Sequence, residues 1–146
     1  MNGTLDNLVA VWESVYALGV AAQEYFISFD DIRYNDSQYF SLIGMTSFNL
    51  TKAGWYRFTL TFLWSELDCG EVYWLYLEKN GGLYQTVYRT VYLADTYLSV
   101  NVVCYAMSSG NDVFRFKCES NTLSFNIYSS QVYNQMVIEY ISELQT

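Results

Sequence analysis

The feature that most constrains the fold is an alternation of large apolar and smaller polar side chains between Tyr56 and Phe62. A period of two residues is typical of a β-strand with one buried face, because successive side chains point to opposite sides of the strand. We therefore predict a strand here that buries one row of large side chains. The predicted row is Tyr56, Phe58, Leu60, Phe62 and Trp64, which alternate with Arg57, Thr59 and Thr61.

Short runs of strand-forming residues, separated by turn residues, make up most of the remaining chain. Between residues 72–79 and 83–93, the segment Asn80-Gly81-Gly82 supplies residues that tolerate positive φ and predicts a hairpin. The spacing is typical of a sandwich or barrel and indicates one all-β domain of roughly eight to ten strands. Further strands are predicted over residues 25–29, 39–43, 46–50, 98–104, 113–118, 123–128 and 133–141.

The N-terminal residues 7–25 follow a different pattern. Apolar residues recur there at spacings near three and four, and Asp6 precedes them as a potential N-cap, which favours a short helix. The β-branched residues and Gly19 favour instead a frayed strand or an arm. Both interpretations stay open at this point.

Charge and residue types exclude several classes of function. Seven Lys and Arg against fifteen Asp and Glu make the chain acidic, with a net charge of −8, so nucleic-acid binding is not expected. Because the chain has no histidine, it lacks the commonest general base and metal ligand, and we expect no metal, no cofactor and no enzyme. Residues 8–20 are interrupted by Glu13, so we expect neither a signal peptide nor a membrane span.

Four segments carry a family resemblance. Residues 48–58 contain the pattern Ala-Gly-x-Tyr-x-Phe at the entry to the best predicted strand, and residues 73–81 form a strand that ends in a Lys-Asn turn. Residues 110–114 read Gly-Asn-Asp-Val-Phe, and residues 133–140 form the last strand. In this order the segments resemble the trimeric jelly roll shared by the complement component 1q globular heads and the tumour necrosis factor family. The departures are Asn111, inserted in a Gly-Asp pair, and Asn134, where the family often has Gly.

The resemblance covers residues 25–141 and implies an all-β, two-sheet antiparallel jelly-roll sandwich with a short N-terminal helix or arm. We expect the helix or docking arm over residues 1–24 and the jelly-roll domain over residues 25–146. The resemblance also implies three-fold association through aromatic-rich faces and a ligand or receptor surface on the loops or subunit clefts. If the arm docks copies together, replacing Val11 or Val15 by Asp should weaken trimers.

These features predict a non-enzymatic, structural and recognition protein. We expect a homotrimer on a virion or another extracellular surface, such as a spike, a fibre head or a capsid-associated protein. Its partners would be other particle or surface proteins, and a host receptor or glycan. Fifteen Tyr, nine Phe and four Trp favour subunit interfaces. The candidate recognition or interface residues are Trp55, Trp64, Trp74, Tyr84, Tyr88 and Tyr92.

Two other classes of function remain open. Exposed Trp or Tyr side chains that stack on sugars would make a carbohydrate-binding, lectin-like module. An enzyme would need two carboxylates that converge in a cleft, but Glu66, Asp68 and Glu71 are interpreted as a charged turn. Asp30, Asp31 and Asp36 could bind calcium through oxygen ligands, although a solvated acidic loop is favoured.

The cysteines allow two arrangements. Cys104 and Cys118 are equally distant from Asn111 in the sequence, so in a simple hairpin they would face each other and could form a disulfide. A jelly roll of the resembled type allows the two strands to belong to opposite sheets, and we favour two buried free thiols. We expect Cys69 to lie in an exposed turn.

Overall fold

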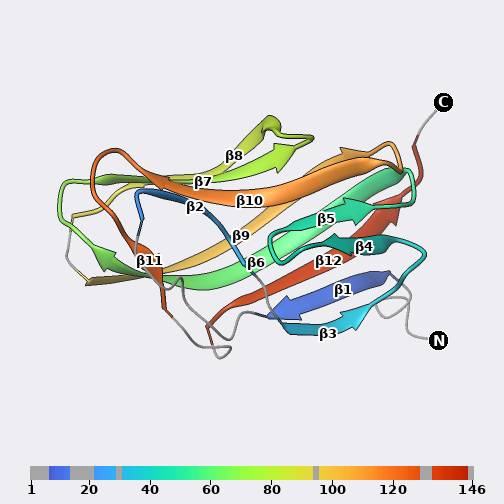
Figure 1. Ribbon diagram of the computed structural model, residues 1–146, viewed down its shortest axis with the longest axis horizontal. Coiled ribbons are helices and arrows are strands. Elements are labelled where there is room, and N and C mark those ends of the chain that lie inside the picture. Colours follow the sequence, from blue (N-terminus) through green and yellow to red (C-terminus); the bar gives the residue numbers. More distant parts are fainter. Residues whose placement is uncertain (1–6, 14–21, 29–30, 94–95, 129–132, 145–146) are drawn as a thin grey trace.

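The computed structural model describes residues 7–13, 22–28, 31–93, 96–128 and 133–144. These residues form strands only, arranged in two antiparallel sheets that face each other (Figure 1). The two-sheet antiparallel sandwich predicted from the sequence is therefore confirmed. The strands are β1 (Leu8–Glu13), β2 (Glu24–Phe26), β3 (Asp31–Asn35), β4 (Phe40–Ile43), β5 (Ser47–Leu50), β6 (Gly54–Leu67), β7 (Val72–Lys79), β8 (Gly82–Val91), β9 (Thr96–Ser108), β10 (Asp112–Ser120), β11 (Asn126–Ile127) and β12 (Gln135–Ser142).

Each sheet combines strands that are distant in the sequence. In the first, which we call the β6 sheet, the order is β9-β6-β12-β1-β3, and β11 pairs with β6 beyond the end of β12. In the second, the β10 sheet, the order is β4-β5-β10-β7-β8, and β2 pairs with β10 beyond the end of β5. Consecutive strands β9 and β10 belong to different sheets, so the turn between them carries the chain across the sandwich.

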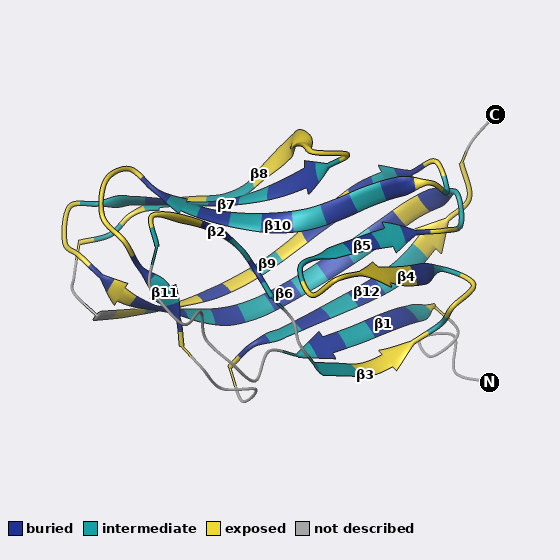
Figure 2. Ribbon diagram, in the orientation of Figure 1, coloured by how far each residue is buried: buried dark blue, intermediate teal, exposed yellow. Residues whose placement is uncertain are grey.

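Aromatic rings from both sheets fill the core. All five predicted inward residues of β6 are at most 2% exposed. Phe58 lies centrally among them, with its ring centroid 5.9 Å from Phe48, 6.2 Å from Phe114 and 5.6 Å from Phe116 of the opposite sheet. Figure 2 shows the resulting alternation along β6 and β10. The buried row read from the sequence is thus the β6 contribution to the core.

The hairpin of β7 and β8 has the predicted turn. Lys79 pairs with Gly82, and the two residues between them, Asn80 and Gly81, have φ of 53° and 83°. Two consecutive positive φ values define a turn whose twist matches that of the flanking strands, and Asn-Gly is the preferred pair for it. The local sequence therefore fixes this reversal.

The helix predicted near the N-terminus is wrong for the residues described there. Leu8–Glu13 forms β1, which pairs with β12 on one side and β3 on the other. Backbone pairing on both sides outweighs a weak helical periodicity, because β-branched residues suit a sheet. At the other end of the predicted helix or docking arm, Ala22 bridges Phe125 and Glu24 begins β2, whereas residues 1–6 and 14–21, including Val15, lie outside the described residues. No described segment is a helix long and apolar enough to cross a membrane.

Asn134, one of the departures from the family pattern, closes the end of the β6 sheet. Its side chain is buried, accepts a hydrogen bond from the Leu63 backbone N–H at 3.2 Å and donates one to the Tyr128 carbonyl at 2.7 Å. Buried backbone groups need such partners. Asn134 therefore has a structural role in joining β6 to the start of β12.

Candidate functional site

The outer face of the β6 sheet is apolar across its centre. The strand registers bring Val11, Val137, Thr59 and Val103 into one row across β1, β12, β6 and β9. Val103 is 56% exposed. We call this surface the apolar face, and it also includes the exposed Tyr105 and Trp55 in the neighbouring rows.

Charge on the apolar face is limited to one ion pair at its centre and to the ion pairs of Arg33 with Glu13 and Asp31 at its β1-β3 edge. Arg57 of β6 and Glu139 of β12 are directly opposite each other, with 2.9 Å between Nη2 and Oε1. Since the opposite charges are in contact, the pair presents little net charge to an approaching surface. The face as a whole therefore suits contact with protein better than contact with a charged polymer.

The outer face of the β10 sheet is built differently, and we call it the charged face. Lys117 Nζ lies 3.4 Å from a carboxylate oxygen of Glu24, 3.5 Å from Glu78 and 3.7 Å from Glu119. Arg115 Nε lies 2.8 Å from Glu78 Oε1. Such alternating ion pairs are typical of a surface that remains in water. The two outer faces therefore differ in chemistry. The centre of the charged face carries ion pairs, whereas the exposed side chains of the apolar face are mostly apolar.

The apolar face ends in an aromatic hollow that the sequence did not reveal. Tyr97, Tyr128 and Tyr133 contact one another edge to face, with centroid distances of 5.8 and 5.6 Å. With Leu63 they line an open hollow of about 370 Å³. Tyr97 is distant in sequence from Tyr128 and Tyr133, so only the folded chain brings it to them.

The six candidate recognition residues fall in separate places. Trp64 is wholly buried, where its ring packs against Phe125 at 5.5 Å and its Nε1 donates a hydrogen bond to Cys118 Sγ at 3.4 Å. It therefore cannot contact a partner of the folded protein. Tyr88, only partly exposed, packs on Trp64 at 6.0 Å.

The other four candidates reach the surface in different regions. Trp55 lies on the apolar face and is 39% exposed. Tyr84 of β8 accepts a hydrogen bond from the Met107 backbone N–H, whereas Tyr92 donates one to the Tyr97 carbonyl. Trp74 of β7 lies on the charged face, since Tyr73 and Leu75 on either side of it are buried. The structure therefore does not join the candidates into one site.

The disulfide considered for Cys104 and Cys118 is wrong, and the favoured buried thiols are confirmed. Cys104 lies on β9 and Cys118 on β10, so the two residues belong to opposite sheets. Burial raises the pKa of each thiol to about 12, which for Cys118 outweighs hydrogen bonds that favour the thiolate. Cys69 is exposed, as predicted.

The acidic residues considered as calcium ligands or catalytic pairs are engaged elsewhere. Asp31 contacts Arg33 at 3.1 Å, while Asp36 Oδ1 accepts a hydrogen bond from the Gln38 backbone N–H at 3.0 Å. Glu71 accepts one from the Thr122 hydroxyl. Asp30 lies outside the described residues. Within the described part of the chain, no group of three or more Cys, Asp or Glu side chains could hold a metal ion.

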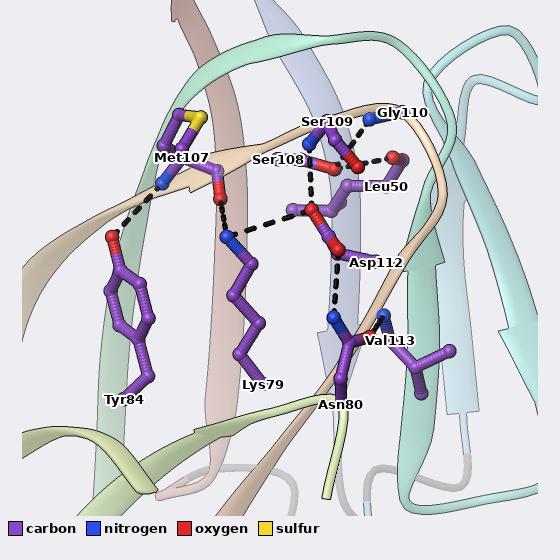
Figure 3. Close-up of polar contacts among 10 residues, drawn as sticks. All are labelled: Leu50, Lys79, Asn80, Tyr84, Met107, Ser108, Ser109, Gly110, Asp112 and Val113. Atoms are coloured by element: carbon purple, nitrogen blue, oxygen red, sulfur yellow. Dashed lines mark hydrogen bonds and ion pairs between the residues drawn. The ribbon is translucent and has the colours of Figure 1, made fainter. Parts of the chain in front are cut away.

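A polar corner joins the β7-β8 turn to the crossover between β9 and β10 (Figure 3). Asp112 is its centre, since its carboxylate accepts hydrogen bonds from Asn80 Nδ2 at 2.8 Å and from the Ser109 backbone N–H at 2.6 Å. Lys79 Nζ lies 3.5 Å from the same carboxylate and donates a hydrogen bond to the Met107 carbonyl. These contacts hold the crossover between β9 and β10 against the β7-β8 turn.

The electrostatics of the corner favour the charged form of Asp112. Burial alone raises the pKa of this carboxyl group, but the hydrogen bonds from Ser109 and Asn80 and the charge of Lys79 outweigh burial. The pKa therefore falls from 3.8 to about 2. Sequence analysis quoted Asp112 only as part of a family motif and did not identify this network.

Comparison with known proteins identifies the fold. No family model and no curated protein matches the sequence. Among solved structures, murine APRIL at pH 8.0 aligns over 92% of this chain and 99% of its own, with 12% identity and a TM-score of 0.67. Eiger TNF from S. frugiperda aligns over 96% of each chain, with 9% identity and a TM-score of 0.56. The chain has a TNF-like jelly-roll fold.

The TNF-like fold confirms the resemblance found in the sequence segments. At such low identity the likeness concerns the fold alone, so the recognition properties of this TNF-like chain have to be argued from its own side chains. The features available for that argument are the apolar face, the charged face and the aromatic hollow.

Proposed function

We propose that this protein is a non-enzymatic recognition module that works as a homotrimer, with its copies in contact through the apolar face. The observation that carries the proposal is the difference between the two outer faces. Lys117 and Arg115 with their carboxylate partners keep one face in water, while Val103, Tyr105 and Trp55 are 56%, 49% and 39% exposed on the other. A contiguous apolar surface of this kind marks a protein contact.

The geometry of a trimer adds a second requirement. A closed ring of three copies needs two different complementary surfaces on each copy, because such contacts are head to tail. The edge formed by β8 supplies an exposed apolar surface, shown largely in yellow in Figure 2, with Leu83 at 65% and Val91 at 45% exposed. We place this edge of one copy against the apolar face of the next.

The proposed setting is the exterior of a virion or another extracellular surface, where the trimer would attach to a surface protein or host receptor. The TNF-like fold supports a recognition role, and the acidic charge of −8 supports a soluble surface that avoids anionic polymers. Binding of the purified trimer to intact cells, with saturation by unlabelled trimer, would test this setting.

The oligomeric state is tested by light scattering on the purified protein. The expected mass is three times the 17.0 kDa of one chain, with and without reductant because the trimer needs no disulfide. Val103→Arg should produce monomers, because it places an unpaired charge on the apolar face. Val113→Arg is the matched control on the charged face and should remain trimeric. A wild-type monomer would overturn the proposal.

A further inference from the structure

Trp74 and Tyr76 form a pair of aligned rings on the charged face, which the proposed trimer contact does not use. The two residues alternate outward on β7, and their rings are nearly parallel, with an interplanar angle of 12° and a centroid distance of 6.5 Å. Both side chains are partly exposed. Large aromatic rings that stay partly in water on a rigid strand provide flat apolar surface at a low cost in side-chain entropy.

Polar groups of both charges flank this pair. Glu119 and Arg89 lie directly opposite Trp74 on β10 and β8, and Lys117 lies directly opposite Tyr76. Next to Tyr76 an open hollow of about 180 Å³ is lined by Tyr76, Glu78, Leu83, Lys117 and Glu119. The flat apolar surface is thus bordered by carboxylate acceptors and ammonium or guanidinium donors.

The ring faces are not tightly covered by the neighbouring cations. Arg89 lies 5.8 Å from the Trp74 centroid and Lys117 lies 5.6 Å from that of Tyr76. By contrast, Arg115 lies 3.7 Å from the ring centroid of Phe26 on the same face. Cation-π contacts are effective within about 6 Å, so those at Trp74 and Tyr76 are at the outer limit. A ligand can therefore reach these rings by a small shift of two long, flexible side chains.

We propose that this surface binds a pyranose ring of a glycan, a site that goes beyond the proposed trimer. A pyranose has one apolar face of C–H groups, which packs on an aromatic ring, and a rim of hydroxyl groups that both donate and accept hydrogen bonds. Trp74 and Tyr76 supply the packing surface. Glu119 and Lys117 supply an acceptor and a donor at its border.

The charge arrangement favours a hydroxyl-rich ligand over a polyanion. Lys117, Arg115 and Arg89 are balanced on this face by Glu24, Glu78 and Glu119, and most of these charges are already paired. A balanced surface gives no long-range attraction for a phosphate or sulfate polymer. The hydroxyl groups of a sugar, in contrast, can form the hydrogen bonds that water makes to these charged side chains, and they need no net charge on the surface.

The two rings lie on the opposite side of the sandwich from the apolar face, and the site borders the trimer contact only at the β8 edge, where Leu83 lines the hollow next to Tyr76. A trimer would carry three copies of the site, and binding to a glycan-covered surface would then be strengthened by multivalency. A single site tested with a soluble monovalent sugar does not depend on the number of copies. Failure of the trimer and failure of the sugar site are therefore distinguishable.

The test begins with an array of neutral and sialylated oligosaccharides probed with the full chain, followed by titration of the best ligand in solution. Trp74→Ala and Tyr76→Ala should each weaken binding about tenfold or more, corresponding to about 1.4 kcal/mol. Glu119→Gln keeps both rings and should also weaken binding, which preserves the test if an alanine variant does not fold. Tyr34→Ala on the edge strand β3, where the side chain is 44% exposed, is the aromatic control and should bind like the wild type.

Three results would overturn the proposal. The first is that the wild type binds no oligosaccharide on the array. The second is that the two ring variants and Glu119→Gln bind the selected sugar with wild-type affinity. The third is that a proline-rich peptide binds at these rings and no sugar competes with it. Aligned aromatic side chains can also bind proline-rich segments.

Discussion

Removing the charge of Asp112 tests whether the polar corner stabilises the fold. Asp112→Asn keeps the size of the side chain but leaves one fewer acceptor for Asn80 and Ser109 and removes the charge near Lys79. Because the pKa of Asp112 falls from 3.8 to about 2 on folding, its charged form contributes about 2 kcal/mol to stability. We expect the variant to lose about that much at pH 7.

The pH dependence gives the sign of the effect. A carboxyl group with a lowered pKa stabilises the fold above its unfolded pKa, and this contribution is lost as the pH falls through the folded pKa. The wild-type advantage over Asp112→Asn should therefore be constant above about pH 5 and shrink as the pH falls from 3.8 to about 2.

The assay is urea unfolding followed by tryptophan fluorescence, at one protein concentration because unfolding of an oligomer depends on concentration. Asp68→Asn, at an exposed carboxylate, is the control and should change stability by less than about 0.5 kcal/mol. The reasoning is refuted if Asp112→Asn is equally neutral at pH 7, or if its deficit stays constant between pH 4 and pH 2.

Further predictions concern packing and thiols. Gly54→Ala would place a Cβ atom 2.5 Å from the Ser142 carbonyl oxygen, so its free energy of unfolding in urea should fall by several kcal/mol. Gly70 also has a positive φ but lies in open space, so Gly70→Ala should lose only about 1 kcal/mol. Phe58→Ala should destabilise by about 3–5 kcal/mol in the same assay, and Thr59→Ala on the outer face by far less; equal losses would contradict the assigned core. Cys104 and Cys118 should not react with a thiol reagent until the protein is unfolded, and rapid labelling of either in the native state would contradict their burial.

The parts of the fold that were predictable are those with local signals. The alternation of apolar and polar residues predicts strand β6, and Asn80 and Gly81 predict the hairpin of β7 and β8. The sequence could not decide between a helix and a strand near the N-terminus because a register shift between Leu8 and Ala10 buries both Val9 and Ala10, so the period of two is broken. Strand β3 was read as a loop because it is an edge strand with polar side chains such as Arg33.

The sites were less predictable because they depend on which strands share a sheet. Trp64 and Trp74 both lie in strands whose apolar and polar residues alternate. Trp64 belongs to the inward row predicted for β6 and is buried, whereas Trp74 points outward from β7 and is partly exposed. The sequence could not decide whether Cys104 and Cys118 meet, since their strands are consecutive but belong to different sheets. The same non-local pairing created the aromatic hollow and the polar corner.

The pairing of β1 with β12 has a consequence for synthesis on the ribosome. Strand β1 is synthesised long before its partner β12, so the nascent β6 sheet lacks its middle until β12 has emerged. At about 5–20 residues per second, β6 waits for several seconds with an unpaired edge. Unpaired edges attract other chains, so yield in cells should depend on chaperone capacity during that interval more than on the stability of the finished protein.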